Sequence, residues 1–266
     1  MSAELRTERH GHVLVLTVDD PKTRNALDGD DFFTAIEAAV HLANTDLGVR
    51  AVILTGAGRA FSSGGNVRDM QARRGMFGGS PDRIVEQYRN GIQRIPRAFA
   101  RLDVPAIAAV DGPAIGAGCD LACMCDIRIA SKRAVFAESF VRVGIVPGDG
   151  GSWLLPRVVG QSRAAELAFT GAAIDADEAL RIGLVSRVVA PEELMPAAFE
   201  LAERIAANPP QVLRWTKRLL REASHERLDA TLERAASYQA IAHHTRDHAE
   251  AVDALLAKRP PVFEGR

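Results

Sequence analysis

Two glycine-rich turns in the sequence carry backbone N–H groups that could bind a carbonyl oxygen. In the first, Gly116-Ala117-Gly118 follows an apolar segment, residues 104–110, and precedes a helix. Small residues leave the first amides of that helix uncovered, and these amides have no acceptor within the helix. The helix dipole adds partial positive charge there, so a developing oxyanion would be stabilised without a charged side chain. The same run also fits a tightly packed turn that binds nothing.

The second turn could supply the other half of an oxyanion hole. Residues 51–55 are apolar and predict a buried strand, and residues 56–67 continue the chain as a turn rich in glycine and serine. Two backbone N–H groups that converge on one carbonyl oxygen stabilise enolates and acyl-transfer intermediates, often more than any other group in the site. Together the two turns predict a site that polarises a carbonyl group.

Three carboxyl groups near these turns are candidates for proton transfer. Asp120 follows the first turn, Asp149 lies in a glycine-rich turn, and Glu138 precedes Phe140. A carboxyl group buried beside a bound carbonyl would have its pKa raised toward neutral, where it serves as an acid or base. Each also has a structural explanation: Asp120 could cap the helix, Asp149 could form an Asx turn, and Glu138 could face solvent.

Other chemistries fit the sequence less well. Gly56-Ala57-Gly58 follows a strand, as in dinucleotide-binding loops, but Phe61 stands where the third glycine is required. A serine hydrolase built on Ser62 or Ser63 would need a histidine, and all seven histidines lie outside the motifs. The three cysteines lie in one apolar segment with no histidine at ligand spacing. They predict buried thiols in a reducing cytoplasm and no metal site.

The composition is that of an ordinary globular protein. The 266 residues carry a formal net charge of −1, with 47% hydrophobic and 25% charged residues. Since neither charge sign dominates, nothing favours nucleic acid or a membrane as a partner, and an anionic ligand would need local cations. Charged residues at the N-terminus argue against a signal peptide. The lack of an apolar stretch of about 18 residues argues against a membrane span. We therefore expect a cytoplasmic protein.

The elements that position these residues alternate between strands and helices. The first strand is expected at residues 12–18 and the first helix from Asp28 onward. Apolar strands separated by a helix indicate parallel crossover units. The later predictions are a helix at 88–102 interrupted at Pro96, short strands at 126–130 and 134–137, a segment at 152–159 broken at Pro156, a helix capped by Asp175, and a helix at 191–207. The glycine-rich residues 74–81 predict a mobile segment, which fits an ordinary surface loop.

From Pro209 onward only helices are predicted. This tail is too small to form its own core, so it should pack on the preceding part or on a neighbouring subunit. We assign residues 1–200 to a core domain and residues 201–266 to a helical oligomerisation region.

The order and spacing of the motifs resemble the crotonase, or enoyl-CoA hydratase/isomerase, superfamily over nearly the whole chain. The matching motifs are residues 60–66, 112–126, 143–151, 179–185 and 258–266. The resemblance implies an α/β fold, a spiral of ββα units followed by the helical C-terminal region. It also implies a homotrimer, which commonly pairs into a hexamer as a dimer of trimers.

The resemblance assigns roles to individual residues. The oxyanion donors fall on the N–H groups of Gly65 and Ala117, and Asp120 stands where the hydratases have one of two glutamates. Phe140 stands at the other glutamate position and is expected to wall the acyl pocket, whereas Asp149 lies one residue beyond the position of an isomerase acid. The remaining substrate-binding residues would be Arg24, Ala26, Ala60, Ser62, Gly64, Asn66 and Gly116, with Lys258 and Phe263 from a neighbouring subunit.

The resemblance implies an enzyme that processes acyl-CoA thioesters in fatty acid metabolism. No cofactor is expected to be permanently bound, since coenzyme A enters as part of the substrate. Hydration of a 2-enoyl-CoA through a thioester enolate is the favoured reaction. Double-bond isomerisation is the alternative, and because Phe140 is not an acid, a CoA-thioester-binding homologue without catalytic activity also stays open.

Overall fold

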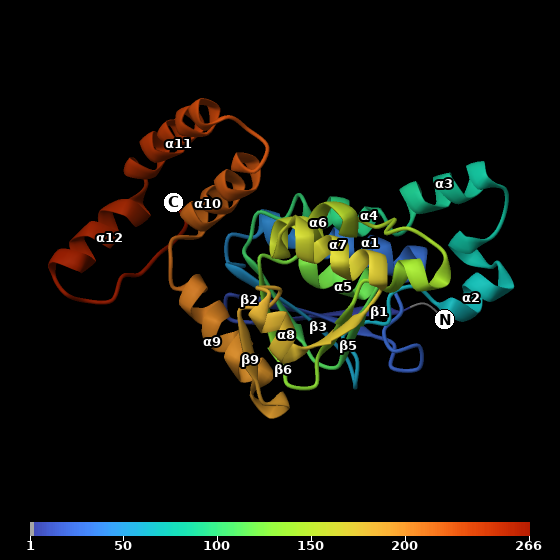
Figure 1. Ribbon diagram of the computed structural model, residues 1–266. Coiled ribbons are helices and arrows are strands. Elements are labelled where there is room, and N and C mark those ends of the chain that lie inside the picture. The colour runs from blue at the N-terminus through green and yellow to red at the C-terminus, as the bar shows by residue number, and fades with distance from the viewer. Residues whose placement is uncertain (1–2) are drawn as a thin grey trace.

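A six-stranded sheet forms the centre of the molecule (Figure 1), which a computed structural model describes for residues 3–266. In sheet order, its strands are β1 (Glu4–His10), β2 (Val13–Asp19), β3 (Ala51–Gly56), β4 (Ala106–Val110), β6 (Ile127–Ser131) and β9 (Arg187–Val189). All neighbouring pairs are parallel except β1 and β2. The predicted parallel sheet is therefore confirmed, although β1 and β9 were not expected from the sequence.

Alternate residues of the central strands point into two separate cores. Val52, Leu54 and Ala108 face one core, whereas Ile53 and Ile107 face the other. This alternation follows from the twofold side-chain period of a strand, and burial on both faces explains why these strands are continuously apolar.

Helices cover both faces of this sheet (Figure 1). On the side of the larger core lie α1 (Asp30–Thr45), α4 (Arg94–Phe99), α5 (Ala117–Cys123), α6 (Gly151–Val159), α7 (Gln161–Thr170) and α8 (Ala176–Arg181). On the other face lie 3-10 helix η3 (Pro191–Glu193) and α9 (Leu194–Ala206), which buries Leu194, Ala198 and Ala202. The segment between β3 and α4 contains α2 (Val67–Ala72), the 3-10 turn η1 (Gly75–Phe77) and α3 (Pro81–Asn90).

A second, smaller sheet lies beside the predicted turns. It consists of β5 (Pro113–Ile115), β7 (Val135–Ala137) and β8 (Ala173–Asp175), and η2 (Ser139–Val143) follows β7. The sequence predicted that the chain turns directly from β4 into α5, and this was wrong. A short strand intervenes because its backbone pairs with the other turn: Ser62 N–H donates to Pro113 O at 3.1 Å, and Ile115 N–H donates to Ser62 O at 3.0 Å.

Several predicted boundaries need correction. Helix α1 begins at Asp30 rather than Asp28, whose carboxylate instead accepts the Gly29 N–H. Pro156 does not break α6, which runs on to Val159. The helix interruption expected at Pro96 comes earlier, between α3 and α4. Pro96 lies in the first turn of α4, where a backbone N–H would have no acceptor within the helix. The predicted cap is confirmed, because the Asp175 carboxylate accepts the Glu178 N–H at 2.8 Å.

The C-terminal helices are α10 (Pro210–Ala223), α11 (Leu228–His243) and α12 (Arg246–Leu256), and they extend from one side of the molecule (Figure 1). Helix α10 is held to the core by the buried Arg214, whose guanidinium donates to the carbonyl oxygens of Ala43 and Val49 at 2.9 Å each. Ala43 lies in the last turn of α1, where carbonyl groups lack intrahelical partners. Residue 200, the predicted domain boundary, falls inside α9.

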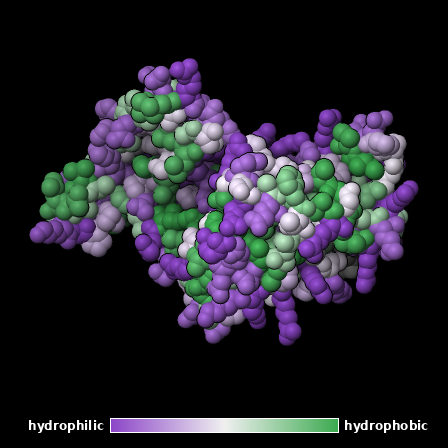
Figure 2. Space-filling view, in the orientation of Figure 1, coloured by the Kyte–Doolittle hydropathy of each residue, from purple (hydrophilic) through white to green (hydrophobic). Residues whose placement is uncertain are grey.

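The C-terminal helices expose large apolar side chains. Leu220 is 73% exposed, Leu228 and Ile241 are also exposed, and no residue of α11 is buried. Figure 2 shows hydrophobic surface over α11 and at the far end of α12. Among residues 3–266, no helix combines the length and apolar character needed to cross a membrane.

Candidate active site

The two glycine-rich turns meet at the start of α5. A Cβ atom on Gly64 would lie 3.0 Å from the Ala117 nitrogen and closer still to the Ile115 carbonyl oxygen, so only glycine permits this approach. Gly64 also has a φ of +72°, which glycine adopts without strain. Within the described chain, neither the Gly65 nor the Ala117 N–H has a hydrogen-bond acceptor. The structure thus brings two free backbone donors together, as an oxyanion hole requires.

Asn25 organises the turn that carries Gly65. It is fully buried, and its Nδ2 donates to Ala60 O at 2.7 Å and to Ala57 O at 2.9 Å. The Ser62 hydroxyl donates to Asn25 O at 2.7 Å and accepts the Gly64 N–H at 3.1 Å. Ser62 is therefore a structural hydroxyl, and Asn25 is a positioning residue that sequence reasoning missed. Its φ of +61° is one that asparagine tolerates better than most residues, but this signal is visible only in the structure.

Asp120, Glu138 and Asp149 come together in one buried cluster. They are 0%, 2% and 3% exposed. A Cβ atom on Gly151 would lie 2.5 Å from Asp120 Oδ2, and under 3.0 Å from both Asp120 Oδ1 and Glu138 Oε1. Both Asp120 oxygens and one oxygen each of Glu138 and Asp149 are buried without a hydrogen-bond partner. Glu138, which could equally have faced solvent, thus belongs to the cluster.

The three carboxyl groups of the cluster differ in how strongly their pKa is shifted. Burial, followed by the charges of Asp149 and Glu138, raises the pKa of Asp120 well above its usual range. Burial also raises the pKa of Asp149, and it raises the pKa of Glu138 to about 7. A hydrogen bond from Asp120 lowers the pKa of both Glu138 and Asp149, because a protonated Asp120 stabilises the neighbouring carboxylates. Of the three carboxyl groups, Asp120 is therefore the one whose protonated form its surroundings favour most.

Apolar side chains surround the two donors. The Phe140 ring lies 3.6 Å from the position of a Cβ on Gly116, and Phe77 lies 3.4 Å from the corresponding position on Gly65. The Tyr88 ring packs on Gly148, and burial and the charge of Asp149 raise the pKa of its hydroxyl. Phe140 therefore packs beside the Gly116 turn, and its role as a wall of an acyl pocket stays a prediction.

Most of the predicted substrate-binding residues lie on the turn next to these donors. Ala26 pairs with Gly64 as a parallel bridge, and a cavity of about 590 Å³ adjoins Ala26, Asn66 and Arg74. Arg24 is exposed beside Ala26, and Ala60 and Ser62 hold the turn.

Lys258 and Phe263 do not reach this place within one chain. The Phe263 carbonyl oxygen accepts a hydrogen bond from Arg50 at 2.7 Å, and Arg50 directly precedes β3, at the opposite end of that strand from the turn. Their assignment to a neighbouring subunit's site stays a prediction.

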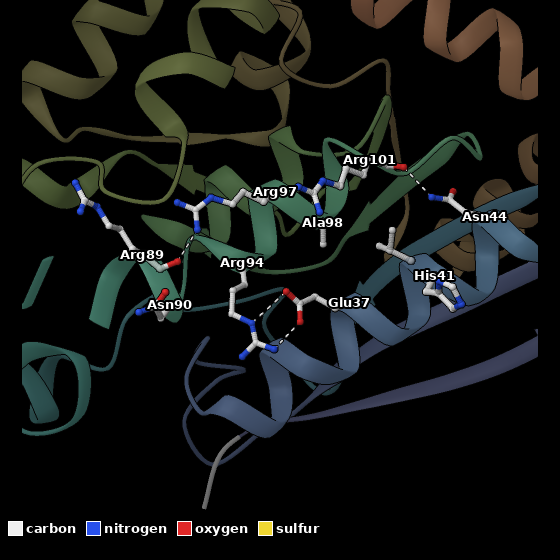
Figure 3. A pocket seen from close by; sticks show the side chains of 10 residues that line it. Glu37, His41, Asn44, Arg89, Asn90, Arg94, Arg97, Ala98 and Arg101 are labelled. Carbon is white, nitrogen blue, oxygen red and sulfur yellow. Dashed lines mark hydrogen bonds and ion pairs between the residues drawn. The ribbon is translucent and has the colours of Figure 1, made fainter. Parts of the chain in front are cut away.

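An arginine-lined groove of about 580 Å³ lies between α1, α3 and α4, apart from the predicted site (Figure 3). Arg94 is paired with Glu37 at 2.5 Å, and Arg97 donates to the Arg89 carbonyl oxygen at 2.5 Å. None of the predicted site residues lines it. The groove is a separate surface feature.

The cysteines and histidines contribute no site in the part of the chain that the structure describes. Cys119, Cys123 and Cys125 are free and buried, and burial raises the pKa of Cys125 to about 12. Among residues 3–266, no group of histidine, cysteine and carboxylate side chains is arranged to hold a metal ion.

Two free backbone N–H groups beside buried carboxyl groups of unequal pKa are the arrangement expected of an enzyme that acts next to a carbonyl group. Comparison with known proteins identifies its family. The sequence profile of the enoyl-CoA hydratase/isomerase family matches residues 8–266, and this chain belongs to that family.

Relatives and solved structures agree with this assignment. The chain is 38% identical to the short-chain-enoyl-CoA hydratase of Clostridium acetobutylicum, over 95% of this chain and 94% of that protein. It is 36% identical to the 1,2-epoxyphenylacetyl-CoA isomerase of Escherichia coli, over 96% and 95% of the two chains. The crystal structure of an enoyl-CoA hydratase from Bacillus anthracis superposes with a TM-score of 0.91 at 30% identity, covering 100% of both chains. The predicted family and fold class are confirmed.

Proposed function

We propose that this protein adds water to the double bond of a 2-enoyl-CoA thioester. The observation that carries the proposal is the pair of free N–H groups at Gly65 and Ala117 beside a buried cluster of three carboxyl groups, whose pKa values are all raised by burial. The hydratase names of several relatives support the same reaction.

In the proposed reaction, the thioester carbonyl oxygen accepts hydrogen bonds from the Gly65 and Ala117 N–H groups. These bonds draw electron density toward the oxygen, so C3 of the conjugated double bond becomes electrophilic. Asp149 removes a proton from water as the oxygen bonds to C3, and the electron pair of the double bond moves into an enolate. Asp120 then protonates C2, so one water molecule is added in total.

Asp149 compensates for the absence of an acid at Phe140. A hydration needs one group to take a proton from water and another to deliver one to C2, and the cluster supplies both although Phe140 supplies neither. An isomerase needs only one group that moves a proton between two carbons. The three buried carboxyl groups therefore favour hydration, while isomerisation is the second candidate because the Escherichia coli relative carries an isomerase name.

We further propose that the protein works in the cytoplasm as a homotrimer or a dimer of trimers. Exposed apolar side chains on α10 and α11 support assembly, since such surfaces mark interfaces. In the assembly, Lys258 and Phe263 would close the coenzyme A site of a neighbouring subunit. Coenzyme A enters as part of the substrate, with no permanently bound cofactor.

The test is the absorbance of crotonyl-CoA mixed with the purified protein, together with mass spectrometry of the product. Loss of the conjugated thioester with a gain of one water is expected. Asp120→Asn and Asp149→Asn should each lower kcat by about a hundredfold or more. If crotonyl-CoA binds unchanged and a 3-enoyl-CoA is converted into its 2-enoyl isomer, the protein is an isomerase. If neither thioester reacts although both bind, it is a binding protein.

A further inference from the structure

Glu138 has no step in the proposed reaction, yet it is one of the most buried charged side chains in the described structure. It is 2% exposed, and its Oε2 has no hydrogen-bond partner. Burying a carboxyl group without a cation costs stability. Such a group is therefore a candidate for a functional role.

Glu138 touches the proton donor of the cluster. Its Oε1 and Asp120 Oδ1 both lie under 3.0 Å from one point, the position of a Cβ on Gly151. Glu138 follows β7 and Asp120 lies in α5, so residues from two elements meet over the first residue of α6. The two carboxyl groups are thus neighbours, and a hydrogen bond with Asp120 is one of the influences on the pKa of Glu138. A proton can pass along such a bond when one of the two groups is protonated.

A cavity lies on the other side of Glu138. Its volume is about 160 Å³, and it lies between α6, α7 and the turn at Pro147. By volume it can hold several water molecules, since one water occupies about 30 Å³ of liquid. Ser152 and Gln161 provide polar groups in its wall, and Phe169, 80% exposed, lies at its outer side. Glu138 therefore borders both the carboxyl cluster and a space that leads toward solvent.

We infer that Glu138 is a positioning residue that accepts the Asp120 proton and exchanges it with water in this cavity, while an acyl-CoA covers the front of the site. The inference rests on the proposed function. Removal of a C2 proton first requires Asp120 to pass its own proton to Glu138. The Asp120 carboxylate then takes the C2 proton, and the electron pair left on C2 becomes the enolate held by the Gly65 and Ala117 N–H groups. Glu138 loses its proton to water, and the C2 proton then follows the same path from Asp120 through Glu138 to water. A proton from water returns through Glu138 and Asp120 to C2, which restores the thioester and completes the exchange.

The pH dependence of this exchange follows from the groups that face Glu138. These are Asp120, Cys119 and Cys123 on α5 and Asp149 before α6. Among the described residues that line the adjoining cavity there is no lysine or arginine. Burial places the pKa of Glu138 at about 7. Below this pH Glu138 is protonated and cannot accept the Asp120 proton, so exchange slows as the pH falls.

The experiment measures incorporation of deuterium from D₂O at C2 of butyryl-CoA by mass spectrometry. The same protein preparations are assayed for hydration of crotonyl-CoA. Glu138→Gln should lower the exchange rate by about tenfold or more and abolish its decrease below neutral pH, with KM for crotonyl-CoA within about twofold of wild type. Glu166→Gln, an exposed carboxyl group on α7 paired with Arg163, is the matched control and should change neither rate.

A second variant tests the cavity without touching the cluster. Ala168 is half-buried on α7 and lines the cavity, so Ala168→Leu places a larger side chain in the cavity wall. This variant should lower the exchange rate by about threefold or more and leave KM for crotonyl-CoA unchanged. Ser162→Leu, exposed on the same helix and outside the cavity, is its control.

The outcomes separate the two proposals. If wild type hydrates crotonyl-CoA and Glu138→Gln keeps the exchange rate and its pH profile, the role of Glu138 is wrong. Unchanged exchange in Ala168→Leu overturns the path through the cavity. If wild type shows neither hydration nor exchange although butyryl-CoA binds, the proposed function itself fails.

Discussion

Gly151→Ala is the substitution that most directly tests whether the carboxyl cluster depends on its geometry. Gly151 is the first residue of α6, and its φ is not positive, so alanine can adopt its backbone conformation. The added methyl group would lie 2.5 Å from Asp120 Oδ2 and under 3.0 Å from Glu138 Oε1, where ordinary contacts begin at 3.4 Å. The two carboxyl groups must therefore move.

The size of the effect follows from this displacement. A shift of about 1 Å in a catalytic group costs on the order of a hundredfold in rate, which corresponds to about 2.7 kcal/mol in the activation free energy. Crowding a packed interior costs about 1–3 kcal/mol of unfolding free energy. Replacing glycine by alanine in a helix returns up to about 1 kcal/mol. We thus expect activity to fall by about a hundredfold and the unfolding free energy to fall by about 0–3 kcal/mol.

The assay compares kcat/KM for crotonyl-CoA hydration with the free energy of unfolding in urea. Gly48→Ala is the matched control, because its methyl group would also crowd a charged pair, Arg9 and Asp46, but on the surface and away from the site. The control should keep full activity. A Gly151→Ala enzyme that also keeps full activity would refute the argument that the position of these carboxyl groups controls the reaction.

Three further predictions concern stability and assembly. Asn25→Ala removes the hydrogen bonds to Ala57 and Ala60 and should lower the unfolding free energy in urea by about 3 kcal/mol. Glu138→Gln should raise the unfolding free energy, and by more at about pH 8 than at about pH 5. The pKa of Glu138 is higher in the folded than in the unfolded protein, so the wild-type native state loses stability as the pH rises through about 7. Equal gains at both pH values would contradict this. Leu220→Glu should shift sedimentation from oligomer toward monomer.

The parts of the fold that could be predicted are those with a local pattern. The apolar strands β3 and β4 and the buried face of α1 follow from side-chain periodicity within single segments. The two turns were recognisable because glycine and serine cluster directly after strands. Asp120 and Asp149 were candidates because they adjoin such turns.

The features that could not be predicted depend on contacts between distant segments. The three-residue strand β5 exists because its backbone pairs with β7, some twenty residues later in the chain, and with Ser62, some fifty residues earlier. Asn25 lies before α1 but supports a turn after β3. The sequence offered three candidates for proton transfer with separate structural explanations. Only the fold shows that they share one cluster over Gly151, where their protonation states depend on each other.

The apolar walls and the carboxyl cluster serve one electrostatic requirement. Three carboxyl groups without a facing cation cannot all be ionised in a medium of low polarity, so at least one stays protonated at neutral pH. Phe140, packed over Gly116, helps to keep that medium apolar, whereas a glutamate there would add a fourth negative charge. The loss of an acid at Phe140 and the presence of one at Asp149 are therefore compatible with the same reaction. In the proposed reaction, the acid Asp120 and the base Asp149 would thus be distinguished by their surroundings and not by their residue type.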